Sequence, residues 1–81
     1  MVDLSSIKAD EVLDCKGLSC PMPMLKTKKA LQKLQSGQIL EVWGTDPGSK
    51  NDIPNMCKKE GHEFLGFVDE AGYTRYFIRK K

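Results

Sequence analysis

The sequence has no long hydrophobic run, and this limits where the protein can work. None of its 81 residues belongs to an apolar stretch near the roughly 18 residues that a membrane-spanning helix requires. Residues 1–11 carry acidic side chains and lack the apolar centre of a secretory signal. We therefore expect a cytoplasmic protein with no membrane contact. The length predicts one domain, residues 1–81, and excludes a large enzyme with its own dinucleotide-binding fold.

The chain also has little excess of one charge sign over the other and few aromatic side chains. Thirteen Lys and Arg residues against eleven Asp and Glu residues leave a formal net charge of +2, and aromatic residues make up 7% of the chain. Domains that bind nucleic acids usually combine a strong basic balance with aromatic stacking platforms. A nucleic-acid-binding or regulatory module is therefore disfavoured, and we expect no direct nucleic-acid contact.

Cysteines are few and odd in number. The three cysteines, in a chain without an export signal, do not form the paired framework of a small secreted domain. We expect their thiols to be reduced, and at least one of them to be a candidate reactive group. The three cysteines are Cys15, Cys20 and Cys57.

The hydrophobic spacing predicts six elements in the order β-α-β-α-β-β. The predicted strands are residues 11–15, 38–44, 63–69 and 73–79, and the predicted helices are residues 21–36 and 52–60. Apolar and small residues recur every three or four positions along the first helix, at Met24, Thr27, Leu31 and Leu34. These elements predict an α/β (α+β) two-layer sandwich, in which two helices cover one face of a four-stranded mixed sheet.

Turn residues separate these elements. Gly37 and Gly61 are expected to end the two helices, and residues 70–72 to join the last two strands as a hairpin. Residues 45–51 are predicted to form a loop. Ser49 and Asn51 are both suitable N-caps for the second helix, and Pro54 favours the later start because proline is best tolerated in a first turn.

Cys20 stands at the predicted start of the first helix, directly before Pro21. A helix N-terminus carries unpaired N–H groups and a partial positive charge, which favour an anion at that point. A thiol placed there loses its proton more readily, and the thiolate is the nucleophilic form. The same field would stabilise a persulfide anion. Pro21 and Pro23 stiffen the backbone around the sulfur, and Gly17 allows the preceding loop to turn tightly.

The residues around Cys20 carry a family resemblance. The segment from Gly17 and Leu18 through Cys20, Pro21 and Pro23 resembles the G-L-x-C-P-x-P signature of the TusA/SirA-like sulfur-carrier proteins. Residues 13–14 resemble the L-D pair that precedes this loop, residues 46–54 the D-P-x-x-x-x-D-I-P segment, and residues 76–80 the last strand of the family. The resemblance covers nearly the whole chain, and the family fold is the sandwich that the hydrophobic spacing predicts.

The resemblance implies a sulfur-relay carrier rather than a stand-alone enzyme. Cys20 would accept sulfur as a persulfide from a cysteine desulfurase or a rhodanese, and would pass it to a cysteine of a DsrE/TusD-like acceptor protein. Pro21 and Pro23 would shape the loop, and neither a metal nor a cofactor is required. The resemblance leaves open whether the sulfur goes to tRNA thiolation, molybdenum-cofactor synthesis, sulfur oxidation or selenium handling. A carrier that presents one exposed loop is expected to be a monomer.

The other two cysteines are expected to fill the core. The alternative is a thiol-disulfide redox or sensor module in which Cys20 pairs with Cys57 or Cys15. A zinc site made from the cysteines and His62 is disfavoured, because their spacing does not match known zinc motifs. His62 is expected at the surface or at a sheet edge.

Basic side chains on the first helix are candidates for partner contacts. Lys26, Lys29 and Lys33 share its outward face, where they are either solvated or dock on the acidic surfaces of sulfur donors and acceptors. Asp46, in the segment that matches the family pattern, is a further candidate contact. Met22 flanks Cys20 with a side chain suited to an adaptable contact surface.

Overall fold

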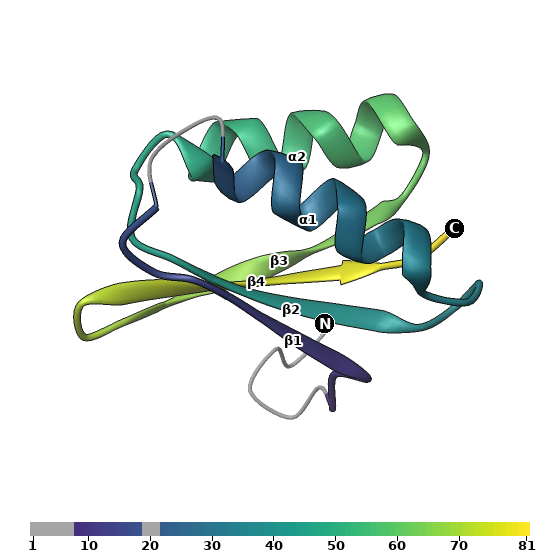
Figure 1. The fold of residues 1–81 in the computed structure, drawn as a ribbon, viewed down its shortest axis with the longest axis horizontal. Helices are drawn as coiled ribbons and strands as arrows, with labels where there is room; N and C mark the ends of the chain where they lie inside the picture. The colour runs from purple at the N-terminus through teal and green to yellow at the C-terminus, as the bar shows by residue number, and fades with distance from the viewer. Residues whose placement is uncertain (1–7, 19–21) are drawn as a thin grey trace.

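The chain forms two layers, a sheet and a pair of helices (Figure 1). The structure is a computed structural model that describes residues 8–18 and 22–81. The elements along these residues are β1 (Glu11–Cys15), α1 (Met22–Lys33), β2 (Ile39–Gly44), α2 (Ser49–Glu60), β3 (Glu63–Glu70) and β4 (Tyr73–Arg79). This confirms the predicted β-α-β-α-β-β order.

The sheet has the strand order β1-β2-β4-β3. β1 pairs with β2 in parallel, whereas β2 with β4 and β3 with β4 are antiparallel, so the sheet is mixed as predicted. Both helices lie on the same face of the sheet (Figure 1). Among the described strands β1 lies at an edge of the sheet, and α1, which connects β1 to its parallel neighbour β2, lies beside that edge.

The core lies between the helices and the sheet. Its fully buried side chains come from α1, α2, the two central strands and the end of β1, and include Leu31, Leu40, Val42, Ile53 and Ile78. The predicted apolar face of α1 is confirmed, because Thr27 and Leu31 are buried and Met24 and Leu34 pack against the core. Among the described residues, no helix is both long enough and apolar enough to cross a membrane.

Four predicted boundaries are wrong. β2 begins at Ile39 rather than at residue 38. α1 ends at Lys33 rather than at residue 36, and the chain then turns through Gly37, whose φ is 88°. β3 extends to Glu70, which leaves a two-residue turn before β4. α2 begins at Ser49, so residues 49–51 are helical rather than part of a loop.

The early start of α2 depends on backbone hydrogen bonds and on burial. Gly48 is the N-cap, no side chain caps the helix, and the N–H groups of Asn51 and Asp52 donate to the carbonyl of Gly48 at 3.1 and 3.0 Å. Ser49 and Ile53 are buried one turn apart, and this burial holds the first turn in place. Pro54 therefore stands in the second turn, where its missing N–H removes one helical hydrogen bond.

The sheet face away from the helices holds a small charged and aromatic cluster. Glu41 is only 6% exposed there, and Arg75 binds it through Nε at 3.1 Å. The indole N–H of Trp43 donates to the same carboxylate. The Arg75 guanidinium also lies 5.2 Å from the centre of the Phe77 ring, which is fully buried. These contacts satisfy a carboxylate that would otherwise be costly to bury.

Candidate functional site

The segments that follow β1 and β2 lie at the same end of the sheet. Because β1 and β2 are parallel, both strands end there, and the two segments lead into the start of α1 and the start of α2 (Figure 1). Cys20 and Pro21 lie outside the described residues. Leu18 and Met22 are the nearest described residues on either side.

The segment from Lys16 to Leu18 is held by three hydrogen bonds that its backbone N–H groups donate. The N–H of Lys16 donates to Asp14 Oδ1 at 3.0 Å, and the N–H of Leu18 donates to the carbonyl of Cys15 at 3.2 Å. Between them, the N–H of Gly17 donates to Thr45 Oγ1 at 2.9 Å. The turn therefore has defined anchors on β1 and on the loop after β2.

Two motif residues in this segment have structural reasons for their identity. Gly17 has a φ of 83°, in the left-handed region that costs a residue with a Cβ atom about 1 kcal/mol or more. Leu18 is half-buried and packs against the hydrophobic core. The glycine makes the turn, and the leucine attaches the turn to the body of the protein.

Pro23 occupies the first turn of α1, as predicted, and is fully buried. Its carbonyl accepts a hydrogen bond of 2.7 Å from the buried hydroxyl of Thr27, one turn further along the helix. The beginning of α1 is therefore fixed against the core rather than frayed into solvent.

Cys15 and Cys57 are core residues, which confirms the expectation for both. Each is fully buried, and neither forms a disulfide. Burial raises the pKa of the Cys57 thiol to about 11 and also raises the pKa of the Cys15 thiol, the latter against the opposing charge of Lys26. A buried thiol with a raised pKa is a poor nucleophile, so neither residue suits sulfur transfer.

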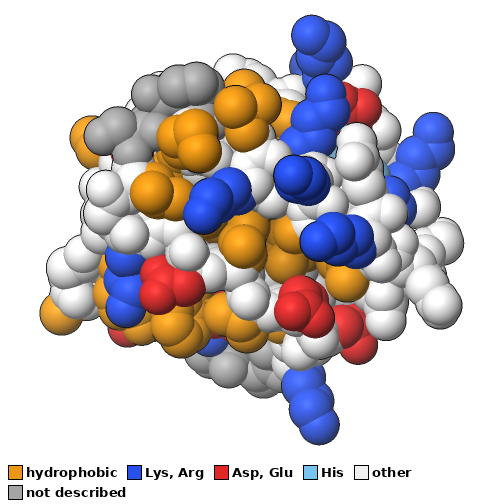
Figure 2. Space-filling model, in the orientation of Figure 1, with side chains coloured by type: hydrophobic (Ala, Val, Ile, Leu, Met, Phe, Trp, Pro, Cys, Tyr) orange, Lys and Arg blue, Asp and Glu red, His pale blue; other side chains and the backbone are white. Residues whose placement is uncertain are grey.

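An exposed surface of mixed character begins at the start of α1. Met22 is 44% exposed and Leu25 is 49% exposed, and Figure 2 shows hydrophobic and lysine side chains together on this face of the molecule. Lys26 and Lys29 are exposed as predicted, whereas Lys28 forms an ion pair of 2.8 Å with Glu60 of α2. Leu25 was not predicted as a contact residue, although it lies outside the predicted buried face of α1.

Asp46 has a local structural contact. Its Oδ1 accepts the N–H of Gly48 at 3.0 Å, in the turn that leads into α2. It also lines a hollow of about 360 Å³ between the loop after β2 and the β3–β4 hairpin, together with Lys50, Asp69 and Glu70. Asp46 was predicted as a candidate contact, but its neighbour Thr45, whose hydroxyl oxygen accepts a hydrogen bond from the motif loop, was not.

The described residues contain no group of three or more Cys, His, Asp and Glu side chains that could hold a metal ion. His62 immediately precedes β3, where its Nδ1 accepts the backbone N–H of Lys81 at 3.1 Å. This hydrogen bond gives His62 a structural contact with Lys81.

Comparison with known proteins agrees with this architecture. The family described as Sulfurtransferase TusA matches residues 11–80. YrkI of Bacillus subtilis is 51% identical over 91% of this chain and 99% of its own length, and the sulfur carrier protein TusA of Pseudomonas entomophila is 46% identical over 89% and 90%. The crystal structure of a SirA-like protein from Desulfitobacterium hafniense has the same fold, with a TM-score of 0.76 over 85% of this chain and 95% of that one at 24% identity. The chain therefore belongs to the TusA sulfurtransferase family.

Proposed function

We propose that the protein is a sulfur-relay carrier and that Cys20 bears the sulfur as a persulfide. Membership of a family whose relatives are named sulfur carrier proteins supports the carrier role. The observation that directs the chemistry to Cys20 is the burial of the other two cysteines, whose raised thiol pKa values make them unsuitable. Gly17, Leu18, Pro21 and Pro23 form the motif loop around Cys20 in this proposal.

The chemistry consists of two thiol exchanges. In the first, the Cys20 thiolate attacks the outer sulfur of a donor persulfide, which forms a Cys20 sulfur–sulfur bond, breaks the donor's sulfur–sulfur bond and releases the donor thiolate. In the second, the thiolate of an acceptor cysteine attacks the outer sulfur on Cys20, and the Cys20 thiolate is released. Each step makes one sulfur–sulfur bond and breaks one, so no external oxidant or reductant is consumed.

The fixed neighbourhood of Cys20 suits such a relay. The turn before it is anchored to β1 and to Thr45, and α1 after it is anchored through Pro23 and Thr27. These anchors hold both ends of a short segment that two different proteins must reach in turn. An attachment of this kind lowers the entropy lost when a partner binds.

Partner proteins are part of the proposal. The donor is a cysteine desulfurase or a rhodanese and the acceptor is a DsrE/TusD-like protein, both acting in the cytoplasm, with tRNA thiolation, cofactor synthesis or sulfur oxidation as the destination. Exposed Met22 and Leu25 would supply adaptable apolar contacts, and Lys26 and Lys29 would attract acidic surfaces. Asp46, in the loop after β2, would supply a further partner contact.

The test is intact-mass analysis after incubation with a cysteine desulfurase and cysteine without reductant. We expect the gain of one sulfur atom, removable by dithiothreitol and located on Cys20 by peptide mapping. Cys20→Ser should abolish the gain, and the matched control, Cys15→Ala with Cys57→Ala, should retain it. Loading that persists in Cys20→Ser would sink the proposal.

The same experiment tests the alternative redox module. A disulfide between Cys20 and Cys15 or Cys57 would lower the mass by two hydrogens and would not add sulfur. The burial of both potential partners opposes this alternative, because the core would have to open before either thiol could react.

A further inference from the structure

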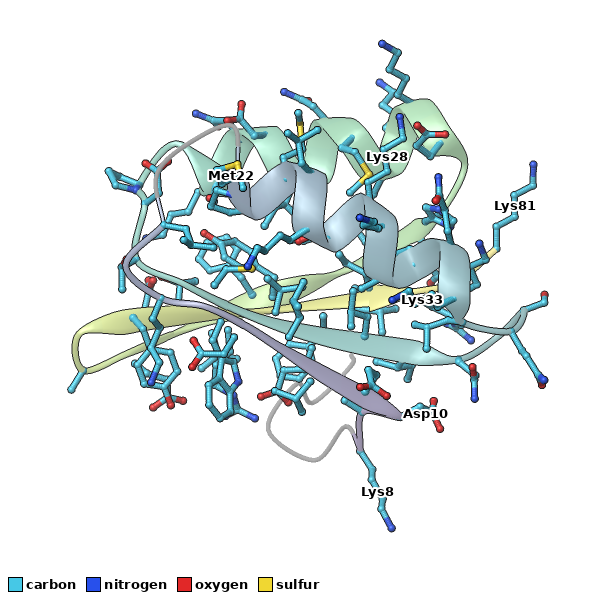
Figure 3. The ribbon with its side chains drawn as sticks, viewed as in Figure 1. Lys8, Asp10, Met22, Lys28, Lys33 and Lys81 are labelled. Carbon is cyan, nitrogen blue, oxygen red and sulfur yellow. The ribbon has the colours of Figure 1, made fainter. Side chains whose placement is uncertain are left out.

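A basic groove runs between α1 and the open edge of the sheet. It has a volume of about 370 Å³ and is lined by Glu11, Val12, Leu13, Lys26, Lys29, Ala30, Lys33 and Leu34. The lining residues come from the edge strand β1, from α1 and from Leu34, which directly follows α1. In Figure 3 the side chain of Lys33 projects from the last turn of α1, on the side where β1 begins.

The lysines of this groove have no carboxylate partner within the described part of the chain. The ion pairs there use Lys28, Lys50, Arg75 and Arg79, and none uses the three groove lysines. Glu11 also lines the groove, so three cationic side chains face one carboxylate. The groove therefore presents an excess of positive charge that is available to an acidic ligand.

The floor of the groove is the edge of β1 that no other described strand pairs with. The N–H of Lys80 donates to the carbonyl of Gln38 at 2.7 Å and continues the β2–β4 ladder, so alternate β2 residues, Glu41 among them, turn their backbone groups toward β1. In the parallel register of Val12 with Glu41, the N–H and C=O groups of Glu11 and Leu13 pair with β2. Those of Val12 and Asp14 therefore point toward the open edge. These groups can pair with an added strand.

The side chains on the two faces of β1 favour one alternating pattern in such a strand. On the helix side, the lysines from Lys26 to Lys33 extend over about 10 Å at the rise of an α-helix. Three alternate residues of an extended strand cover about 13 Å, which long lysine side chains can bridge. On the opposite face Val12 is 47% exposed, and it would contact the intervening residues if they were apolar.

We propose that the groove binds an extended segment of a partner protein as a fifth strand beside β1, with carboxylates at alternate positions facing Lys26, Lys29 and Lys33. The identity of that partner as a sulfur donor or acceptor rests on the proposed function. Strand addition gives affinity through backbone hydrogen bonds, and the alternate side chains give specificity. Because β1 leads directly into the motif loop, the docked segment would hold the partner next to Cys20.

The test uses a ten-residue peptide of alternating glutamate and valine with blocked ends, titrated into the isotopically labelled Cys20→Ser protein and followed by NMR. The serine variant removes sulfur chemistry, so binding and sulfur loading can fail independently. We expect saturable shifts at the amides of Val12 and Asp14. The triple substitution of Lys26, Lys29 and Lys33 by alanine should weaken binding about tenfold or more at low salt. The matched control, Lys58→Ala with Lys59→Ala and Lys81→Ala, removes the same charge elsewhere and should weaken it about twofold or less.

Two peptides carrying N-methyl groups separate strand addition from general charge attraction. Only one set of alternate amides in an added strand faces β1, so methylation of that set should abolish binding and methylation of the other set should leave it intact. Equal binding of the two methylated peptides, or equal losses in the two triple variants, would overturn the proposal. Equally tight binding of a single-stranded oligonucleotide would also overturn it. The proposal would fail as well if the protein with its three groove lysines did not bind the peptide while the triple alanine variant aggregated. That result would mean that the lysines protect the strand edge from pairing.

Discussion

Gly17 and Thr45 join two loops that are far apart in the sequence. The N–H of Gly17 donates to Thr45 Oγ1 at 2.9 Å, which connects the turn before Cys20 to the segment after β2. Since β1 and β2 are parallel and Cys15 stands opposite Gly44, the two loops leave the sheet side by side. The position of the motif loop is therefore set by a hydroxyl group 28 residues away.

Thr45→Val should release this loop without unfolding the protein. The substitution removes the acceptor of the Gly17 N–H, and because the site is exposed, water replaces it at a cost of about 0.5 kcal/mol. Hydrogen exchange at the Gly17 amide should accelerate severalfold, whereas Thr45→Ser should keep the protection. Unchanged exchange in Thr45→Val would show that the hydrogen bond does not hold the turn in solution.

Alkylation of the folded protein should discriminate among the three thiols. With a pKa of about 11, the Cys57 thiol is about one part in a thousand ionised at pH 8, and burial blocks the reagent as well. Cys15 is protected for the same reasons. Iodoacetamide at pH 8 should therefore label Cys20 alone, and labelling in guanidinium should reach all three. Peptide mapping that finds rapid native labelling of Cys15 or Cys57 would contradict the structure.

The Glu41–Arg75 pair should make stability depend on pH in the acidic range. Burial by itself raises the pKa of Glu41, but hydrogen bonds from Arg75 and Trp43 and the charge of Arg75 outweigh it, so the pKa lies below the usual 4.5. A carboxyl group with a lowered folded pKa stabilises the protein above its unfolded pKa, and this contribution is lost as pH falls from about 4.5 through the folded value. Glu41→Gln should therefore flatten the unfolding free energy in that interval and lower it at pH 7.

The control for Glu41→Gln is Glu63→Gln. Glu63 pairs with Arg79 at 3.1 Å, but both side chains are about half exposed, so the loss should stay under about 1 kcal/mol. Urea unfolding at several pH values measures both variants. Similar losses at pH 7 would mean that the burial of Glu41 carries no energetic consequence.

Thr27 should contribute to the stability of α1 through its hydroxyl. Thr27→Val keeps the shape of the side chain but removes the 2.7 Å hydrogen bond to the Pro23 carbonyl, which should cost about 1 kcal/mol and lower the melting temperature by roughly 4–8 °C. Thr27→Ser keeps the bond and loses a buried methyl group, at a similar cost. If Thr27→Val is as stable as the parent protein, the Pro23 contact does not anchor the helix.

Local sequence patterns predicted the elements better than their ends. The recurrence of Thr27 and Leu31 determines which face of α1 is buried, because one face of a helix must meet the sheet. The start of α2 escaped prediction since it depends on backbone bonds to Gly48 and on the burial of Ser49, which no side-chain cap announces. The later start predicted from Pro54 is wrong, because the burial of Ser49 and Ile53 in the core outweighs one missing helical hydrogen bond.

The sequence by itself determined the order of the elements, the two-layer class and the motif around Cys20, because these follow from periodicity and from residues close together in the chain. Only the tertiary structure decided that Thr45 binds the motif loop, that Glu41 and Arg75 share a buried pair, and that Lys26, Lys29 and Lys33 border an open strand edge. Each of these depends on strand order and register. Pairing between distant segments sets both, and local spacing does not encode which segments will be neighbours.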